Sequence, residues 1–237
     1  MYVSTSLTGL SIRINVRINR LLNLLSHLFK SLSFADFIVT IKSALFRNEM
    51  IYVYAVDIKN STRSVAEPIF NEGKSDSVVI IKKGEIKELD EFRNKANESA
   101  WEFNCHRFDG VKDFFIAADA STIRHIAWLY KRQDPNRFVI LGEKDALLQY
   151  GLTLPQFRGQ GLAPAVQHEV MRYLREQGFK RMFSLVKSDN KASIKSLEKG
   201  GFSKVGQIRF IKIFGIQVSK KLDVSELNHI NMQPTIR

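Results

Sequence analysis

The residues with the clearest chemical content form a short glycine-containing turn, Gln156-Phe157-Arg158-Gly159-Gln160-Gly161-Leu162-Ala163. The pattern before this turn predicts a strand, and the pattern after it predicts a helix. Such a turn exposes several main-chain N–H groups, and the helix N-terminus adds partial positive charge, so the two together form a cradle for an anion. Gly159 and Gly161 suit this role because, without a Cβ atom, they can adopt positive φ and let phosphate oxygens approach the main chain. A plain tight turn is the alternative.

Two common phosphate-binding motifs do not fit this segment. The dinucleotide-binding fingerprint would place a third glycine at position 164, where the sequence has Pro164. A P-loop would require a Gly-Lys-Ser/Thr run, which does not follow. Pro164 is nevertheless compatible with a helix that begins here, because the first helical turn does not use the missing N–H. The segment therefore predicts an anion cradle of another kind.

The elements that must position this turn alternate between strand and helix patterns along the chain. Helix patterns run from Ile86 to Phe103, from Leu162 to a stop at Gly178, and from Asn190 to Lys199. The strand patterns cover residues 51–58, 78–81, 114–118, 123–130, 138–141, 146–154, 182–186 and, as one or two strands, 205–218.

The turn and its neighbours resemble the GCN5-related N-acetyltransferases, the GNAT superfamily. Gln156, Gly159 and Gly161 match the family's acyl-CoA-binding signature Gln/Arg-x-x-Gly-x-Gly/Ala, and Asn190-x-x-Ser193 and Gly201-Phe202 follow in the family's order. The resemblance covers residues 78–218 and is strongest over 146–202. It implies a mixed α+β fold with a central, mostly antiparallel sheet whose middle strands splay apart, flanked by helices, plus an N-terminal helical and strand extension.

The resemblance also implies acetyl-CoA as co-substrate. No metal is expected, because His27, His168 and His229 show no ligand spacing with Cys or acidic residues. Main-chain groups of the turn would bind the pyrophosphate, the main chain of the preceding strand would pair with the pantetheine amides or hold the thioester oxygen, and Asn190 and Ser193 would contact the arm from the far side. Helix capping explains Asn190 and Ser193 equally well. For Arg158, the alternative to a contact with a cofactor phosphate is a solvated side chain. The expected cofactor-binding residues are Leu152, Leu154, Arg158, Gly159, Gln160, Gly161, Leu162, Ala163, Asn190 and Ser193.

Proton transfer is less well defined by the sequence. In this family the acceptor amine attacks the thioester directly, so an alkylammonium with a pKa near 10.4 must first lose a proton, and a base contributes roughly 10²- to 10⁴-fold in rate. Glu143 and Asp145 precede the strand that ends at the turn, Tyr150 lies within it, and His125 belongs to a neighbouring strand. We take Tyr150, Glu143 and His125 as candidate catalytic residues, although each has an ordinary structural alternative.

The expected general acid departs from the family pattern. Many members have a tyrosine five residues before the Phe of Gly-Phe, and here that position is Leu197. Tyr173 or Tyr150 would have to substitute, or the thiol, with a pKa of about 8.5, would leave unassisted. Two functions remain open: transfer of an acetyl group to a primary amine of an unidentified small molecule or protein, or a catalytically weak or inactive CoA-binding domain that docks a membrane or partner.

The charge of the chain favours an anionic partner. Lys and Arg number 36 against 24 Asp and Glu, giving a net charge of +12, and residues 161–237 hold 14 basic and 6 acidic residues, a surplus of 8. Nucleic acid is not expected, because these basic residues are scattered and the aromatic residues form no single-strand stacking signature. A phosphorylated small molecule fits the charge.

The remaining composition bears on compartment and organisation. One cysteine, Cys105, cannot form an internal disulfide, which favours a reducing, cytoplasmic location. No apolar run is long enough to span a membrane. We expect residues 1–76 to form the N-terminal extension, 77–220 the GNAT-like domain and 221–237 a tail. Within the extension, a basic amphipathic helix would pack on its own domain, on a second copy in a homodimer, or peripherally on a membrane; its apolar stripe is Leu21, Leu25, Leu28 and Leu32.

Overall fold

The fold is taken from a computed structural model of the 237-residue chain. The expected N-terminal amphipathic helix and the expected domain boundary near residue 76 lie outside the residues that the structure describes. The described residues are 45–59, 78–96, 100–136, 138–213 and 216–224.

Two compact units make up the chain. One contains residues 49–210 and 219–237, and the other contains residues 1–48 and 211–218. All the site residues discussed below belong to the first unit.

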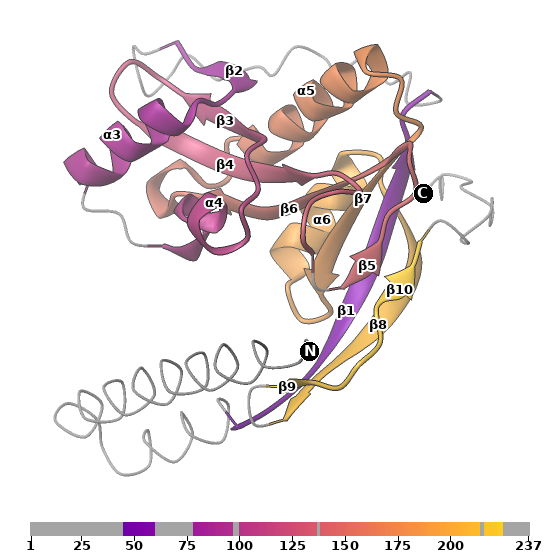
Figure 1. Ribbon diagram of the computed structural model, residues 1–237. Helices are drawn as coiled ribbons and strands as arrows, with labels where there is room; N and C mark the ends of the chain where they lie inside the picture. Colours follow the sequence, from indigo (N-terminus) through magenta and orange to yellow (C-terminus); the bar gives the residue numbers. More distant parts are fainter. Residues whose placement is uncertain (1–44, 60–77, 97–99, 137, 214–215, 225–237) are drawn as a thin grey trace, which may run out of the picture. The chain divides into compact units, whose positions relative to one another are not determined.

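A mixed, mostly antiparallel sheet forms the centre of the fold (Figure 1). Its order is β2-β3-β4-β6-β7-β1-β8, and β9 pairs with the end of β8. The pair β6–β7 is parallel, whereas β2–β3, β3–β4, β4–β6 and β1–β7 are antiparallel. A second, parallel pair joins β5 to β10. The strands are β1 (Phe46–Asp57), β2 (Ile80–Lys83), β3 (Phe114–Ala118), β4 (Ile123–Tyr130), β5 (Val139–Ile140), β6 (Asp145–Thr153), β7 (Arg181–Lys187), β8 (Ser203–Ile213), β9 (Ile216–Gln217) and β10 (Leu222–Asp223).

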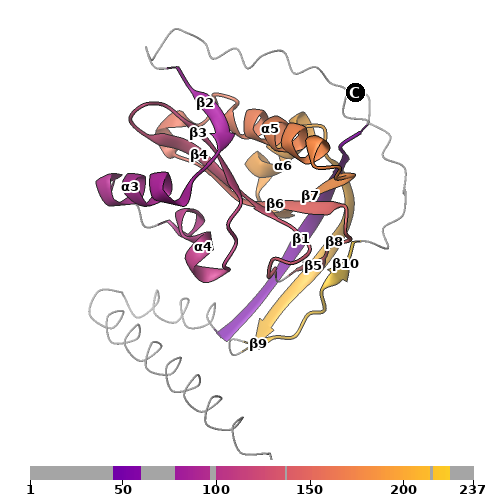
Figure 2. The same cartoon turned by 45° about the horizontal axis from the view of Figure 1, so that its top comes forward.

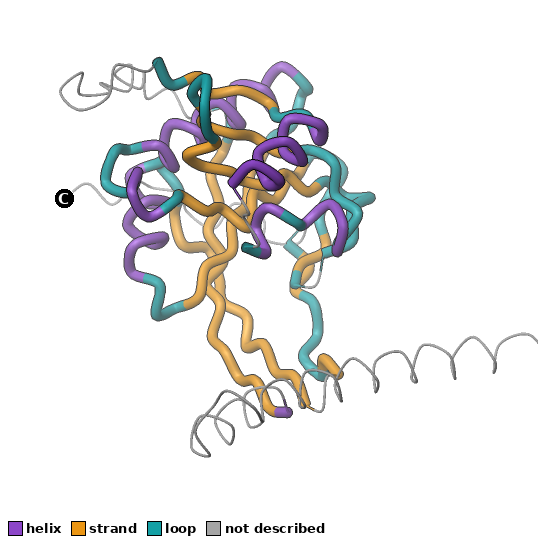
Figure 3. Tube along the Cα trace, turned by 90° about the vertical axis from the view of Figure 1, so that its left-hand side faces the viewer, coloured by secondary structure: helices purple, strands orange, loops and turns teal. Residues whose placement is uncertain are grey.

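Helices cover both faces of the sheet (Figures 2 and 3). One apolar core packs Leu89, Phe92 and Phe103 against one face, and a second packs Val166 and Leu174 against the other. Because both faces are covered, β3 and β4 are buried along their whole length. The helices are α3 (Ile86–Ala96), the 3₁₀ turn η1 (Trp101–Phe103), α4 (Cys105–Phe108), the 3₁₀ turn η2 (Pro155–Phe157), α5 (Leu162–Glu176) and α6 (Lys191–Lys199).

The fold class expected from the sequence is confirmed. The strands expected at 114–118 and 123–130 are observed with the same bounds, and the helix expected after the glycine turn ends where Gly178 takes φ 75. The helix pattern from Ile86 to Phe103 is divided between α3 and η1. The reason is that Ala100, with φ −54 and ψ 142, is extended and begins a separate short turn.

An ion pair lies at the start of the parallel pair β6–β7. The Arg181 guanidinium donates to both carboxylate oxygens of the buried Asp145, at 2.8 Å each. Asp145 and Arg181 are also the first register partners of β6 and β7. A bidentate pair of this kind sets register as well as adding charge-assisted hydrogen bonds.

The joint between β2 and α3 requires glycine at position 84. The Gly84 N–H donates to the Phe114 carbonyl at 2.9 Å, and a Cβ atom there would lie 2.1 Å from the buried Phe114 ring. We expect Gly84→Ala to lower the free energy of unfolding by about 1–3 kcal/mol through overpacking. For a chain of this size, the melting temperature should fall by roughly 2–10 °C in calorimetry.

A matched control is Gly206→Ala in β8. An added Cβ atom there meets its nearest neighbours at 3.9 Å, an ordinary contact distance. An equal loss of stability in both variants would contradict the packing argument.

Candidate functional site

The glycine turn joins the end of β6, through η2, to the start of α5. Gly159 has φ 83 and Gly161 has φ 76, and Gly161 is the N-cap of α5 with no side-chain cap. Residues 158–161 are exposed, and a Cβ atom on either glycine would meet nothing within 4 Å. The first α5 hydrogen bond from this cap runs from the Ala165 N–H to the Gly161 carbonyl, so the N–H groups just before it have no helical acceptor. The turn therefore has the exposed, positively polarised main chain that an anion requires.

A buried ion pair contacts the residues that lead into the turn. Arg124 pairs with Asp119 at 2.6 Å, with both side chains about 95% buried, and the Arg124 guanidinium lies 4.8 Å from the Phe157 ring centroid. The Arg124 carbonyl also accepts from the Leu154 N–H at 3.0 Å. Burial alone would raise the pKa of Asp119, but hydrogen bonds from Ser121, Arg124 and Thr122 hold it well below its usual value. This carboxylate is therefore charged at neutral pH and keeps Arg124 beneath η2.

His125 lies beside the last residue of β6. Its Nδ1 is 2.7 Å from the Thr153 hydroxyl oxygen, and the Thr153 carbonyl accepts from the Arg158 Nε at 3.2 Å. Burial lowers the pKa of His125 to about 4, so the imidazole is neutral at pH 7 and a weak base. A Cβ atom at Gly151 would lie 3.7 Å from the His125 ring.

The paired part of β6 and β7 is shorter than either strand. Register partners run from Asp145–Arg181 to Leu148–Ser184, whereas β6 continues to Thr153. At the last pair, the Ser184 hydroxyl donates to the Leu148 carbonyl at 2.9 Å. On the other side, Leu152 is still a register partner of β4. The β6–β7 register thus ends at Leu148–Ser184, five residues before the end of β6 at Thr153.

A bulge in β6 marks the same place. Between the pairs Trp128–Gln149 and Ile126–Leu152, β6 carries one more residue than β4, so Tyr150 and Gly151 together face one residue of β4. Tyr150 has φ 53, a left-handed value that costs of order 1–3 kcal/mol outside glycine. Its half-buried ring contacts Tyr130 and Trp101 edge-on, at centroid distances of 6.0 and 6.4 Å.

Residues on α6 have structural partners. Asn190 is the N-cap of α6, and its side-chain oxygen accepts from the Ser193 N–H at 3.1 Å. The capping role is thus observed for Asn190, while a contact with a cofactor stays a prediction for both residues. Leu197, at the position of the family's tyrosine, is 4% exposed.

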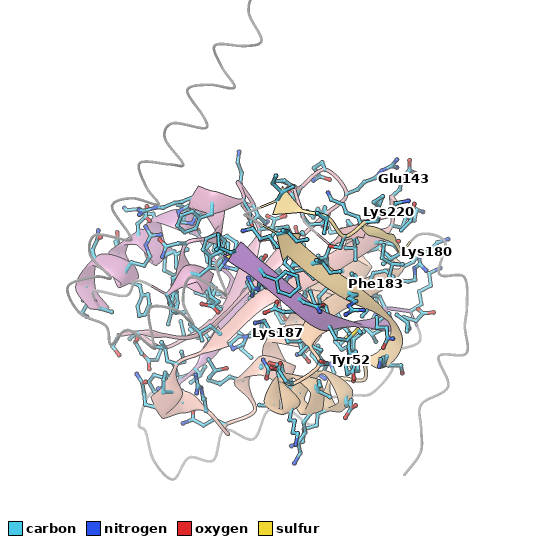
Figure 4. All side chains as sticks on the ribbon, turned by 90° about the horizontal axis from the view of Figure 1, so that it is seen from below. Tyr52, Glu143, Lys180, Phe183, Lys187 and Lys220 are labelled. Carbon is cyan, nitrogen blue, oxygen red and sulfur yellow. The ribbon has the colours of Figure 1, made fainter. Side chains whose placement is uncertain are left out.

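Two sequence candidates lie away from the turn. Glu143 is exposed and pairs with Arg132 at 3.1 Å, just before β6 begins. Figure 4 draws it near Lys180, in agreement with the hydrogen bond from the Lys180 N–H to the Lys144 carbonyl. The nine residues of β6 span roughly 30 Å, so Glu143 and the turn lie at opposite ends of the strand. Tyr173 is eleven residues along α5 from Leu162, roughly 16 Å away, where its hydroxyl accepts from Lys83.

Several residues of this site were not identified from the sequence. Gly151 within a strand pattern is the usual sign of a bulge, and Ser184 is a polar residue inside an apolar strand, so both carried a signal. The contact between His125 and Thr153 carried no sequence signal, because it depends on the register of two strands.

A metal-ligand cluster and a membrane-spanning helix are both absent from the part of the chain that the structure describes. There, no group of three or more His, Cys, Asp or Glu could hold a metal ion. No helix there is long and apolar enough to cross a membrane.

Comparison with known proteins identifies the class of this domain. Residues 86–203 match the family model described as Acetyltransferase (GNAT) domain. Together with the sheet, this match shows that the chain carries a domain of the GNAT acetyltransferase family. A search of curated proteins gave no match.

Solved structures share this fold at low identity. A GCN5-related glucosamine N-acetyltransferase region of a fungal multi-domain GH3 β-N-acetylglucosaminidase is 11% identical over 75% of this chain and 22% of that chain, with a TM-score of 0.51. A GNAT-family putative acetyltransferase from Novosphingobium aromaticivorans is 16% identical (68% and 62% covered, TM-score 0.45). A GCN5-related N-acetyltransferase from Sphaerobacter thermophilus is 13% identical (80% and 59% covered, TM-score 0.49). The chain thus spans less than two thirds of each of these proteins.

The lowered pKa of His125 predicts a pH-dependent contribution to stability. Between the ordinary pKa of 6.5 and the folded value of about 4, the unfolded state binds a proton that the folded state does not. Stability is therefore lost as pH falls through this window, by up to about 3 kcal/mol. We expect the difference in unfolding free energy between the wild type and His125→Gln to shift by this amount, in favour of the variant, between pH 7 and pH 4 in urea titrations.

Proposed function

We propose that this protein is an acetyl-CoA-dependent N-acetyltransferase that transfers an acetyl group directly to a primary amine. The observation that carries the proposal is the exposed glycine turn at the start of α5, which follows the part of β6 that extends beyond the β6–β7 register. An extended ligand with a diphosphate at one end and amide groups along its arm matches these two features. The surplus of basic residues over 161–237 agrees with a phosphate-bearing ligand.

The residues of the chain divide the binding between them. The main-chain N–H groups over 158–163 would hold the diphosphate, with Arg158 beside them. The main chain of Leu152 would pair with the amides of the arm, as in strand addition, and Asn190 and Ser193 would face it from α6. Leu154, which the sequence also suggested, already bonds Arg124 through its N–H and Phe157 through its carbonyl. When bound, acetyl-CoA supplies the activated acetyl thioester.

Proton transfer would depend on the bulge in β6. Tyr150 is positioned there by its left-handed φ and by its contacts with two other rings, so its hydroxyl is our candidate to protonate the leaving thiolate. His125 is held neutral by burial, and its pKa of about 4 makes it a poor base for an ammonium. Its role would be to hold Thr153, and through Thr153 the start of the turn, while water accepts the proton of the amine.

A second function is favoured by one observation. Leu197 is buried where many family members have a tyrosine, so the chain could bind CoA without efficient transfer. Release of thiol from acetyl-CoA, measured over a panel of amines alongside a CoA titration, separates the two. CoA binding without turnover on any amine would support the binding module instead.

Gly159→Asp tests the cradle itself. Aspartate tolerates the left-handed conformation better than most residues, but it places a negative charge where phosphate is expected. We expect the dissociation constant for CoA to rise about 100-fold or more in calorimetric titration, with the circular dichroism spectrum unchanged.

The matched control is Gly110→Asp. Gly110 also has a positive φ, of 73, with nothing within 4 Å of an added Cβ atom. Unchanged CoA affinity in Gly159→Asp, or an equal loss in both variants, would refute the cradle assignment.

Tyr150→Phe tests the proposed acid. It removes the hydroxyl and keeps the ring contacts, so we expect kcat to fall by roughly 10²-fold with CoA affinity unchanged. The alkaline limb of the kcat profile, where the phenol would lose its proton, should disappear as well. A kcat within a factor of about two of the wild-type value would show that Tyr150 is not the general acid.

A further inference from the structure

A stacked pair of exposed aromatic rings lies next to Tyr150. Trp101 in η1 and Phe108 in α4 stack nearly parallel, with centroids 4.2 Å apart and planes 5° apart. Trp101 is 37% exposed and Phe108 59% exposed. Large aromatic side chains are usually buried, so a stacked pair on the surface is informative in a way that a single exposed apolar residue is not.

This ring pair is continuous with the proposed transfer site. Trp101 contacts Tyr150 edge-on at 6.4 Å, and Tyr150 contacts Tyr130 edge-on at 6.0 Å. Three rings therefore run from the surface to the bulge of β6, and Tyr130 continues the series into β4. The bulge is also the place where the β6–β7 register has just ended. A group packed on the outer rings would lie within a short chain of Tyr150.

The carboxylates nearby suit a cation. Glu102 follows Trp101 in the sequence and Asp109 follows Phe108. The Tyr130 hydroxyl donates to the Asp109 carboxylate at 3.0 Å, which ties this acid to the same group of rings. Arg107 in α4 lies 3.5 Å from the Asp90 carboxylate, which also pairs with Arg93.

We infer that Trp101 and Phe108 form the platform that selects the acceptor, and that the acceptor is a primary amine joined by a short carbon chain to a flat aromatic ring. The ring of the acceptor stacks on the platform, and the short chain places its amine beside Tyr150. This inference rests on the proposed function, since it names the acceptor class for that site. Aromatic pairs contribute about 0.5–1.5 kcal/mol beyond the apolar area that they bury.

The test compares two amines that differ only in the flatness of the ring. The probes are 2-phenylethylamine and 2-cyclohexylethylamine, which carry the same ammonium on the same chain. For the wild type we expect kcat/KM to favour the phenyl compound by roughly 2- to 10-fold. Trp101→Leu and Phe108→Leu should bring this ratio close to one, while Trp101→Phe, which keeps a flat ring, should retain most of it.

Phe46→Leu is the matched control. Phe46 in β1 is 49% exposed and is not a member of the ring series Phe108, Trp101 and Tyr150, so its replacement should leave the ratio unchanged. The KM for acetyl-CoA should be the same in all variants, because none of them alters the glycine turn. Phe108→Leu, at the more exposed ring, keeps the test available if Trp101→Leu does not fold.

Calorimetric titration of both amines, with and without CoA, keeps the two proposals separate. Turnover or CoA binding with a phenyl-to-cyclohexyl ratio near one, or with the same preference in Trp101→Leu and Phe108→Leu, overturns the platform and leaves the proposed function standing. Absence of CoA binding overturns the proposed function, and the platform is then judged by the amine titrations alone. Preferential binding of 2-phenylethylamine that is lost in both platform variants supports the platform, whether or not the protein binds CoA.

Discussion

The early end of the β6–β7 pairing is the constraint on which the candidate site depends. A parallel pair normally satisfies the main-chain groups of both strands along their shared length. Here the β6–β7 register stops at Leu148–Ser184, where the Ser184 hydroxyl donates a hydrogen bond to the Leu148 carbonyl. The bulge at Tyr150–Gly151 then increases the twist of β6. Beyond this point β6 continues to Thr153 outside the β6–β7 register, and this is the stretch on which the proposed cofactor arm would add as a strand.

The glycine turn can bind a diphosphate only if its main-chain N–H groups point in a fixed direction at the start of α5. Helix termini fray, and an exposed turn with two positive-φ glycines has little intrinsic order. The buried Asp119–Arg124 pair compensates, because Arg124 holds Leu154 through its carbonyl and packs its guanidinium on Phe157. A buried ion pair is weak evidence for stability, but it places neighbouring groups precisely in space when both partners are fully hydrogen-bonded. The exposed residues 158–161 of the turn thus directly follow Phe157, which the ion pair holds in place.

Sequence reasoning succeeded where local pattern decides the structure. The strands 114–118 and 123–130 were predicted with their exact bounds because they are apolar and rich in β-formers, and the fold buries them completely. The strand expected at 78–81 is observed as Ile80–Lys83. Its C-terminal end was missed because the last two residues are exposed lysines, which do not fit an apolar strand pattern. The bulge, the His125–Thr153 contact and the Trp101–Phe108 stack depend on cross-strand register or on packing between separate elements, so no short-range pattern could specify them.

The site also separates charges of opposite sign between different elements. The turn at the start of α5 presents N–H groups and Arg158, and exposed lysines of α6 add to the positive side. The carboxylates of Glu102 and Asp109 belong instead to the segments around η1 and α4, beside the exposed rings. An anionic cofactor and a cationic acceptor would each meet opposite charge on approach and like charge at the other's position, which disfavours exchange of the two ligands between sites. The net charge of +12 thus leaves room for a cationic acceptor, because the local arrangement of charge, rather than its sum, governs recognition at short range.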